Sequence, residues 1–254
     1  MRHISSAFAA AIVLWLPIAA SASTAEPVRV LAAFTLKPAL DEIAEGYRKT
    51  GGEVVLVYGP SPSLAQQIEN GVSADLFFSA DPMWMDELVK QHLVKRGAVT
   101  ESVGNHLVLI GKKGTPPAAL EGGIALIQLL GPGPLAMCDP DSHPAGRMAK
   151  ASLTALGIWD AVAKTVARAE NPLLAVKMVA RGDAPYAVVF TTDAMTEPGV
   201  SIVATFPDDS HPPIRYPVAI LAKSANPDAP RFLDYLLSST ATEIFKRLGY
   251  VTPP

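Results

Sequence analysis

The residues best suited to chemistry lie in four stretches where an apolar run gives way to small or hydroxyl side chains and then to helical spacing. They are Thr35 in the first stretch, Ser61 and Ser63 in the second, Ala145 in the third and Pro172 in the fourth. The free N–H groups and the dipole of a helix N-terminus attract anions. Several such termini meeting in one cleft would bind a small anion without a basic side chain, although each one alone is more typical of ordinary helix capping.

Two of these stretches carry capping patterns. Thr35 is positioned to cap a helix whose first turn tolerates Pro38, because the N–H that proline lacks would have no partner there. Ser63 and Gln66 have the spacing of a capping box, which predicts a second helix that begins at Ser63 with Ser61 just ahead of it. Both patterns put a hydroxyl group where it can cap a helix or face a ligand.

Motifs of common enzymes are missing from the sequence. It has no G-x-S-x-G elbow, no P-loop and no G-x-G-x-x-G after the first apolar run. Ser61 or Ser63 with His143 would be the nearest nucleophile and base, and no motif joins them. The histidines are isolated from one another and from Cys138, the only cysteine, which disfavours a metal site and excludes an intrachain disulfide. We therefore expect a protein that is not an enzyme and that holds no cofactor and no metal.

One histidine lies beside a candidate anion-binding stretch. His143 precedes Ala145 by two residues. It either adds a donor whose presence depends on pH or is a loop histidine without a role, and the second interpretation is the more common case.

The composition excludes several classes of protein. The chain has 254 residues, of which 49% are hydrophobic and 18% charged, so it is globular and not disordered. Its 21 basic and 24 acidic residues give a formal charge of −3. That balance offers no electrostatic footprint for nucleic acid or for an anionic membrane.

Residues 1–22 have the pattern of a secretory signal peptide. A basic start precedes an apolar run over residues 7–20 and a small-x-small cleavage pattern, with cleavage possible up to residue 25. The run is shorter than the ~20 residues of a spanning helix. Cys138 lies far from this region and cannot carry the lipid of a lipoprotein. We expect a freely diffusing periplasmic protein that is not a lipoprotein.

Short apolar runs alternate with helical periodicity along the rest of the chain. This alternation predicts parallel sheets covered by helices, with about ten strands, and favours two sheets over one. Proline-rich and glycine-rich stretches at 111–134 and 207–213 mark candidate crossovers between lobes. We expect strands over 28–33, 54–58, 75–79, 106–111, 134–138, 186–190, 200–206 and 216–221, and helices over 63–69, 82–90, 145–156, 172–180 and 230–248.

Several segments occur in an order that is specific to one family. The series resembles the periplasmic molybdate-binding proteins of bacterial ABC importers over essentially the whole mature chain. The segments are Ala-Ala-Phe-Thr-Leu at 32–36, Ser-Pro-Ser-Leu-Ala-Gln-Gln-Ile-Glu-Asn-Gly at 61–71, Ala-Asp-Leu-Phe-Phe-Ser-Ala-Asp at 74–81, Asp-Pro to Pro-Ala-Gly at 139–146, Ala-Thr-Phe-Pro-Asp-Asp-Ser-His at 204–211, Tyr-Pro-Val-Ala at 216–219 and Glu-Ile-Phe-Lys-Arg-Leu-Gly-Tyr at 243–250.

The resemblance implies a two-lobed α/β fold, the type II periplasmic binding protein fold. Each lobe is expected to be a mostly parallel sheet flanked by helices, and two crossover strands would join the lobes as a hinge. Lobe I is expected to hold residues 26–104 and 216–254, and lobe II residues 105–215. The resemblance also implies a monomer that works with a separate ABC permease and a separate ATPase, and no nucleic-acid partner.

The resemblance also implies which residues hold the oxyanion. Thr35 and Ser61 stand where the family has serines whose hydroxyl and N–H groups donate, and Ala145 stands where a backbone N–H donates. Two positions depart from the pattern. Pro172 has no N–H to give, and Phe190 stands where the family has a tyrosine hydroxyl. Two lost hydrogen bonds to a charged group would weaken binding by ~3–6 kcal/mol.

Other donors are available to replace the two that are lost. The hydroxyl groups of Ser63 and Thr191, or a bound water, are the candidates, and a shift of one residue near Asn171 would restore an N–H. A fully ionised oxyanion needs donors only, whereas phosphate also needs an acceptor for its proton, and the matched positions supply no carboxylate. Molybdate and tungstate, which the resemblance implies, therefore remain the first candidates, and cavity size would discriminate against sulfate-like anions. The alternative is a binding or sensing protein of the same fold for a different small anion.

Overall fold

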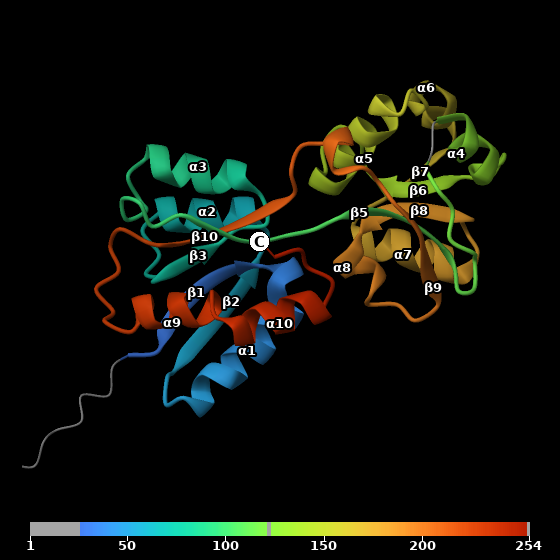
Figure 1. The fold of residues 1–254 in the computed structure, drawn as a ribbon. Helices are drawn as coiled ribbons and strands as arrows, with labels where there is room; N and C mark the ends of the chain where they lie inside the picture. Colours follow the sequence, from blue (N-terminus) through green and yellow to red (C-terminus); the bar gives the residue numbers. More distant parts are fainter. Residues whose placement is uncertain (1–25, 121–122, 253–254) are drawn as a thin grey trace, which may run out of the picture.

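The protein folds into two lobes, each built on one β-sheet (Figure 1). A computed structural model describes residues 26–120 and 123–252, and the predicted signal peptide lies outside these residues. Ten strands of the described ranges form two sheets of five strands, and helices cover both faces of each sheet. This arrangement confirms the predicted two-lobed α/β fold class.

The first sheet has the strand order β2-β1-β3-β10-β4. β1 is parallel to β2 and to β3, and β10 is antiparallel to both β3 and β4. Four strands therefore run in one direction and only β10 opposes them. The strands are β1 (Val28–Ala33), β2 (Val54–Gly59), β3 (Leu76–Phe78), β4 (Thr100–Gly104) and β10 (Arg215–Ile220).

The second sheet repeats this arrangement with the order β7-β6-β8-β5-β9. β6 is parallel to β7 and to β8, and β5 is the one strand that opposes its neighbours. The strands are β5 (Leu107–Lys112), β6 (Leu135–Cys138), β7 (Val166–Ala169), β8 (Tyr186–Phe190) and β9 (Val200–Thr205).

The helices of the first lobe cover its sheet on both faces because successive strand residues point to opposite sides. Leu31 and Phe77 pack with α2 (Ser61–Glu69) and α3 (Pro82–Lys90). Their neighbours Ala32 and Phe78 belong to the core on the other face. That face is covered by α1 (Lys37–Lys49), α9 (Ala229–Leu236) and α10 (Ser239–Arg247).

The second lobe divides its core in the same way. Val108 and Val189 pack with α7 (Pro172–Arg181) and α8 (Thr191–Ala194), whereas Leu109 and Val188 belong to the core on the opposite face. The helices on that opposite face are α4 (Gly123–Leu130), α5 (Pro144–Ala155) and α6 (Trp159–Val162). Short 3-10 turns complete the chain at η1 (Phe34–Leu36), η2 (Ala163–Thr165) and η3 (Asp208–Ser210).

Two crossings of the chain connect the sheets, at residues 105–106 and 206–214. Asn105 ties the first crossing to both lobes. Its side-chain amide donates to the Thr192 hydroxyl of the second lobe at 2.9 Å and to the Tyr216 hydroxyl of the first lobe at 3.1 Å. Asn105 and Tyr216 are buried, so their hydrogen bond lies inside the core.

Some expectations about the elements were wrong. The closing helix is two helices, because Ser238 interrupts it and caps α10 by accepting a hydrogen bond from the Ala241 N–H at 3.3 Å. Strands β4 and β7 were not predicted. Both lie at sheet edges, where a strand needs no continuous apolar run. In the described part of the chain, every helix is too short or too polar to span a bilayer.

Candidate functional site

The predicted anion-binding residues all follow the carboxyl ends of strands. β1 leads into η1 with Thr35, β2 into α2 with Ser61, and β6 into α5 with Ala145. β7 leads into α7 with Pro172, and Phe190 ends β8. Within each sheet these strands are parallel, so their carboxyl ends meet at one edge, where α/β proteins bind ligands.

Contacts between the lobes bring the two edges together. Arg147 of α5 lies 3.8 Å from Asp81, the residue that caps α3. A side chain at Gly249, at the end of the first lobe, would meet Met195 and Thr191 of the second lobe. In Figure 1, α5 and α8 lie on the side of the second lobe that is nearer the first. The strand ends of both lobes thus border one interlobe region.

Thr35 lies at this edge with a hydroxyl group that has no partner. Its Oγ1 atom is buried, and no described residue forms a hydrogen bond with it. The prediction that Thr35 caps the first helix is wrong, since the N-cap of α1 is Leu36. The Tyr250 hydroxyl donates to the Thr35 carbonyl and holds the turn. A buried hydroxyl without a partner is costly, so Thr35 is a candidate donor to a ligand.

Ser61 opens α2 and is buried. Its Oγ accepts a hydrogen bond from the Ala80 N–H at 3.1 Å, which leaves the Ser61 O–H proton free to donate. The helix begins two residues earlier than predicted, so Ser63 lies inside its first turn, exposed, and no capping box forms. Ser61 is therefore the better placed of the two hydroxyl groups.

Ala145 is the second residue of α5 and is 1% exposed. A Cβ at Gly146 would overlap the carbonyl of Asp139, so only glycine lets the helix start directly at the end of β6. The Ala145 N–H already has a partner: it donates to Nδ1 of His143 at 3.1 Å. His143 thus acts as an acceptor and caps the helix, where the sequence suggested either a donor or no role.

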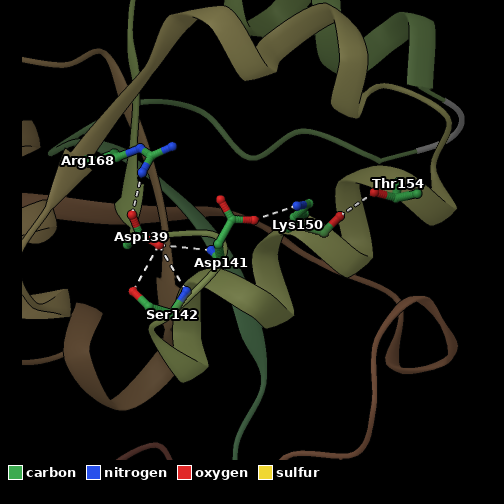
Figure 2. Close-up of polar contacts among 6 residues, drawn as sticks. All are labelled: Asp139, Asp141, Ser142, Lys150, Thr154 and Arg168. Atoms are coloured by element: carbon green, nitrogen blue, oxygen red, sulfur yellow. Dashed lines mark hydrogen bonds and ion pairs between the residues drawn. The ribbon is translucent and has the colours of Figure 1, made fainter.

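The loop that carries His143 is held by Asp139, as Figure 2 shows. Asp139 Oδ1 accepts hydrogen bonds from the Asp141 N–H, the Ser142 N–H and the Ser142 hydroxyl, each at 2.9 Å. Its Oδ2 pairs with Arg168 at 2.5 Å. These hydrogen bonds, together with the charge of Arg168, lower the pKa of Asp139. The carboxylate stays charged and keeps the loop in place.

Pro172 and Phe190 lie at two strand ends of the second lobe, and neither supplies the donor that the resemblance led us to expect there. Pro172 is the first residue of α7, and Asn171 caps the helix by accepting from the Leu174 N–H at 2.9 Å. Leu173, the residue after Pro172, lies in the first turn of α7. An N–H in the first turn has no backbone acceptor within the helix. The Thr191 hydroxyl is 3.5 Å from the His106 carbonyl, a weak contact that leaves it able to turn toward a ligand.

Sequence reasoning missed the carboxyl group of Asp193. It is 6% exposed and accepts a hydrogen bond from the Phe190 N–H at 3.3 Å. Burial raises its pKa from 3.8 to about 7. The only signal for Asp193 in the sequence was its position directly after Thr191 and Thr192, which begin the short helix α8. The Asp81–Arg147 pair was also missed, because nothing in the sequence brings α3 and α5 together.

The described ranges contain no group of three or more histidine, cysteine or acidic side chains arranged to hold a metal ion. The single cysteine, Cys138, is buried, and burial raises its pKa to about 12. The donor set at the lobe edges consists of hydroxyl and N–H groups, which suits an oxyanion.

Comparison with known proteins identifies relatives along almost the whole described chain. Residues 28–251 match the family described as bacterial extracellular solute-binding protein. The molybdate-binding protein ModA of Escherichia coli is 39% identical over 226 residues, 88% of each chain, and ModA of Haemophilus influenzae is 37% identical over 227 residues, 88% of this chain and 89% of the relative.

A solved structure supports the same assignment. The substrate-binding domain of a putative molybdenum ABC transporter from Clostridium difficile superposes with a TM-score of 0.82 at 29% identity, covering 90% of this chain and 99% of that one. These findings confirm the resemblance drawn from the sequence. The chain belongs to the bacterial extracellular solute-binding protein family, and its relatives there include the ModA molybdate-binding proteins.

Proposed function

We propose that this protein binds molybdate or tungstate between its two lobes and delivers it to an ABC permease. The observation that carries the proposal is the buried, unpartnered hydroxyl of Thr35 at the interlobe edge. Its ligand class comes from the relatives, which are molybdate-binding proteins matched over 88% of this chain. A tetrahedral dianion would take the donors that this edge offers.

The proposed donors come from both lobes. Thr35 and Ser61 supply hydroxyl groups from the first lobe, and Ala145 supplies its N–H from the second. At the Pro172 position the neighbouring N–H of Leu173 would replace the missing one, and Thr191 would compensate for the hydroxyl that Phe190 lacks. Ser63 is exposed and would contribute least.

The two sheets would move as separate bodies when the ligand binds. We place the boundaries of lobe I at residues 26–104 and 216–254, and lobe II at 105–215, with the hinge at the two crossings. Closure of the lobes over the anion would turn binding into a signal for the permease. We further propose that the protein is monomeric and non-catalytic. Residues 1–22 would direct its export and then be cleaved, which would leave it free in the periplasm without a lipid anchor.

Isothermal titration calorimetry of the mature, anion-stripped protein tests this proposal. We expect molybdate and tungstate to bind with one site per chain at submicromolar strength, and sulfate and phosphate to give no heat. A protein that binds none of these anions would refute the proposal.

A second candidate function is the binding of a different small anion by the same fold. Pro172 and Phe190 favour it, because both remove donors that the molybdate-binding family uses. A preference for sulfate or another anion in the same titration would support this candidate over the first.

A further inference from the structure

We propose that His143 competes with the oxyanion for the N–H of Ala145, so that this side chain sets both the affinity and its dependence on pH. The inference rests on the proposed function, since it concerns the same site. It assigns to His143 a role as a positioning residue and not as a direct ligand.

The competition follows from the geometry of one N–H group. The backbone N–H of Ala145 has a single hydrogen, which it gives to His143 Nδ1 at 3.1 Å. Ala145 is buried, and while His143 accepts its N–H the residue has no second backbone hydrogen to offer a ligand. An oxyanion that takes this N–H must displace the imidazole. The free energy of the lost Ala145–His143 hydrogen bond then weakens the binding of the anion.

The hydrogen bond also specifies the protonation of His143. A nitrogen that accepts a hydrogen bond carries no proton, so the neutral ring holds its proton on Nε2. Doubly protonated imidazole cannot accept from Ala145. Protonation of His143 therefore releases the N–H and places a positive charge beside the anion site.

The surrounding charges keep His143 neutral while it caps the helix. Burial lowers its pKa, as does the charge of Arg147 on the same helix, and Asp139 at the end of β6 opposes them. Asp139 and Arg147 each have an ion-pair partner of their own. Asp139 pairs with Arg168 of β7, and Arg147 pairs with Asp81 of the other lobe. A bound dianion would reverse the balance and raise the pKa of His143.

The direction of the pH effect follows from this linkage. If the bound protein holds one more proton than the free protein, affinity increases as pH falls, by up to about tenfold per pH unit. The Asp139 network in Figure 2 holds the loop backbone, so only the imidazole needs to move.

Three variants test the proposal by calorimetry with molybdate at about pH 6 and about pH 8, the range in which histidine titrates. His143→Val removes the competing acceptor, and His143→Asn keeps an acceptor that does not titrate. His92→Asn is the matched control, because His92 is exposed at the end of α3 and has a positive φ that asparagine tolerates.

We expect the wild type and His92→Asn to bind about tenfold more tightly at the lower pH. His143→Val should bind more tightly than the wild type at the higher pH, by about three- to tenfold, and show little pH dependence. The affinity of His143→Asn should be as insensitive to pH as that of His143→Val, but it should not be higher than that of the wild type. Asparagine still caps α5, so this variant separates the pH effect from any loss of helix stability.

Two results would overturn the inference, and they are distinguishable. If the wild type binds molybdate but both His143 variants keep its affinity and its pH slope, the proposed function stands and the slope belongs to another group, with Asp193 the first candidate. If the wild type binds no oxyanion at either pH, the proposed function and this inference fail together.

Discussion

The two lobes share one strand order but present different donors at the equivalent strand ends. In the first lobe, β1 and β2 lead to the hydroxyl groups of Thr35 and Ser61. In the second, β6 leads to an N–H already held by His143, and β7 leads to a proline. The first lobe thus supplies two free hydroxyl donors at these strand ends, whereas at the matching positions of the second lobe the Ala145 N–H is occupied and Pro172 has no N–H.

Under the proposed function, this difference assigns the adjustment of ligand preference to the second lobe. Side chains can change there without altering the sheet, because the helix starts are set by backbone geometry at Gly146 and by the Asn171 cap. The second lobe also carries the buried carboxyl of Asp193 at the end of β8. At the equivalent end of β3 in the first lobe, the carboxyl of Asp81 is partly exposed and caps α3.

The largest expected effect concerns that buried carboxyl. The pKa of Asp193 is raised to about 7, so the folded protein keeps a proton that the unfolded chain loses near 3.8. Stability should therefore fall as pH rises from about 4 to about 7 and then level off. Asp193→Asn should remove this slope and add up to about 4 kcal/mol to the free energy of unfolding at about pH 8.

Urea unfolding at about pH 4.5 and about pH 8 measures this effect. Asp86→Asn is the matched control, because Asp86 is exposed on α3 in the first lobe. If the free energies of unfolding of Asp193→Asn and Asp86→Asn depend on pH in the same way, Asp193 is not a buried acid. The two lobes then do not differ in this respect.

Loss of the free hydroxyl in the first lobe should have the next largest effect. Thr35→Ala removes a donor to a charged ligand and should weaken molybdate binding by about 10- to 100-fold. The stability of the ligand-free protein should not fall and should rise slightly, because the variant loses a buried hydroxyl that has no partner in the described structure. Calorimetry and thermal unfolding measure the two quantities. Thr35→Ser keeps the donor and serves as the control, and equal affinity of the alanine and serine variants would contradict the assignment.

A hydrogen-bond donor added to the second lobe would reduce the difference in donors between the two lobes. Phe190→Tyr adds a hydroxyl at the end of β8 and should tighten molybdate binding by up to about tenfold. Phe190→Leu adds no donor and should not tighten it. Competition between molybdate and sulfate, measured by calorimetry, reports the change in preference. Unchanged binding in the tyrosine variant would show that Phe190 does not face the ligand.

The smallest effect is expected where the lobes meet. Arg147 and Asp81 are 3.8 Å apart, and the Arg147 side chain is 43% exposed, so their coupling should be below about 1 kcal/mol. A double-mutant cycle of Arg147→Gln and Asp81→Asn, read as molybdate affinity at low and high salt, measures it. Asparagine keeps the cap of α3. A coupling that does not decrease with salt would indicate a stronger latch between the lobes.

The sequence by itself determined many of the elements, and the family. Apolar runs and helical spacing predicted α3 at residues 82–90 and β8 at residues 186–190 with the bounds that the structure has. Both patterns are local, since they depend on which face of a helix or strand is buried. The order of the motifs likewise identified the positions of Thr35, Ser61 and Ala145 at strand ends.

Only the tertiary structure decided which groups of the candidate site are buried and which are paired. The burial of Asp193 and the pairing of Asp81 with Arg147 depend on residues far apart in the chain, and local patterns carry no information about them. The hydrogen bond from Ala145 to His143 spans two residues, yet it depends on where Asp139 and β6 hold the loop. The spacing of Thr35 predicts a helix cap, but its hydroxyl is free because the 3-10 turn places Leu36 at the helix start. Spacing determines which groups reach a strand end, whereas packing determines whether those groups are already satisfied.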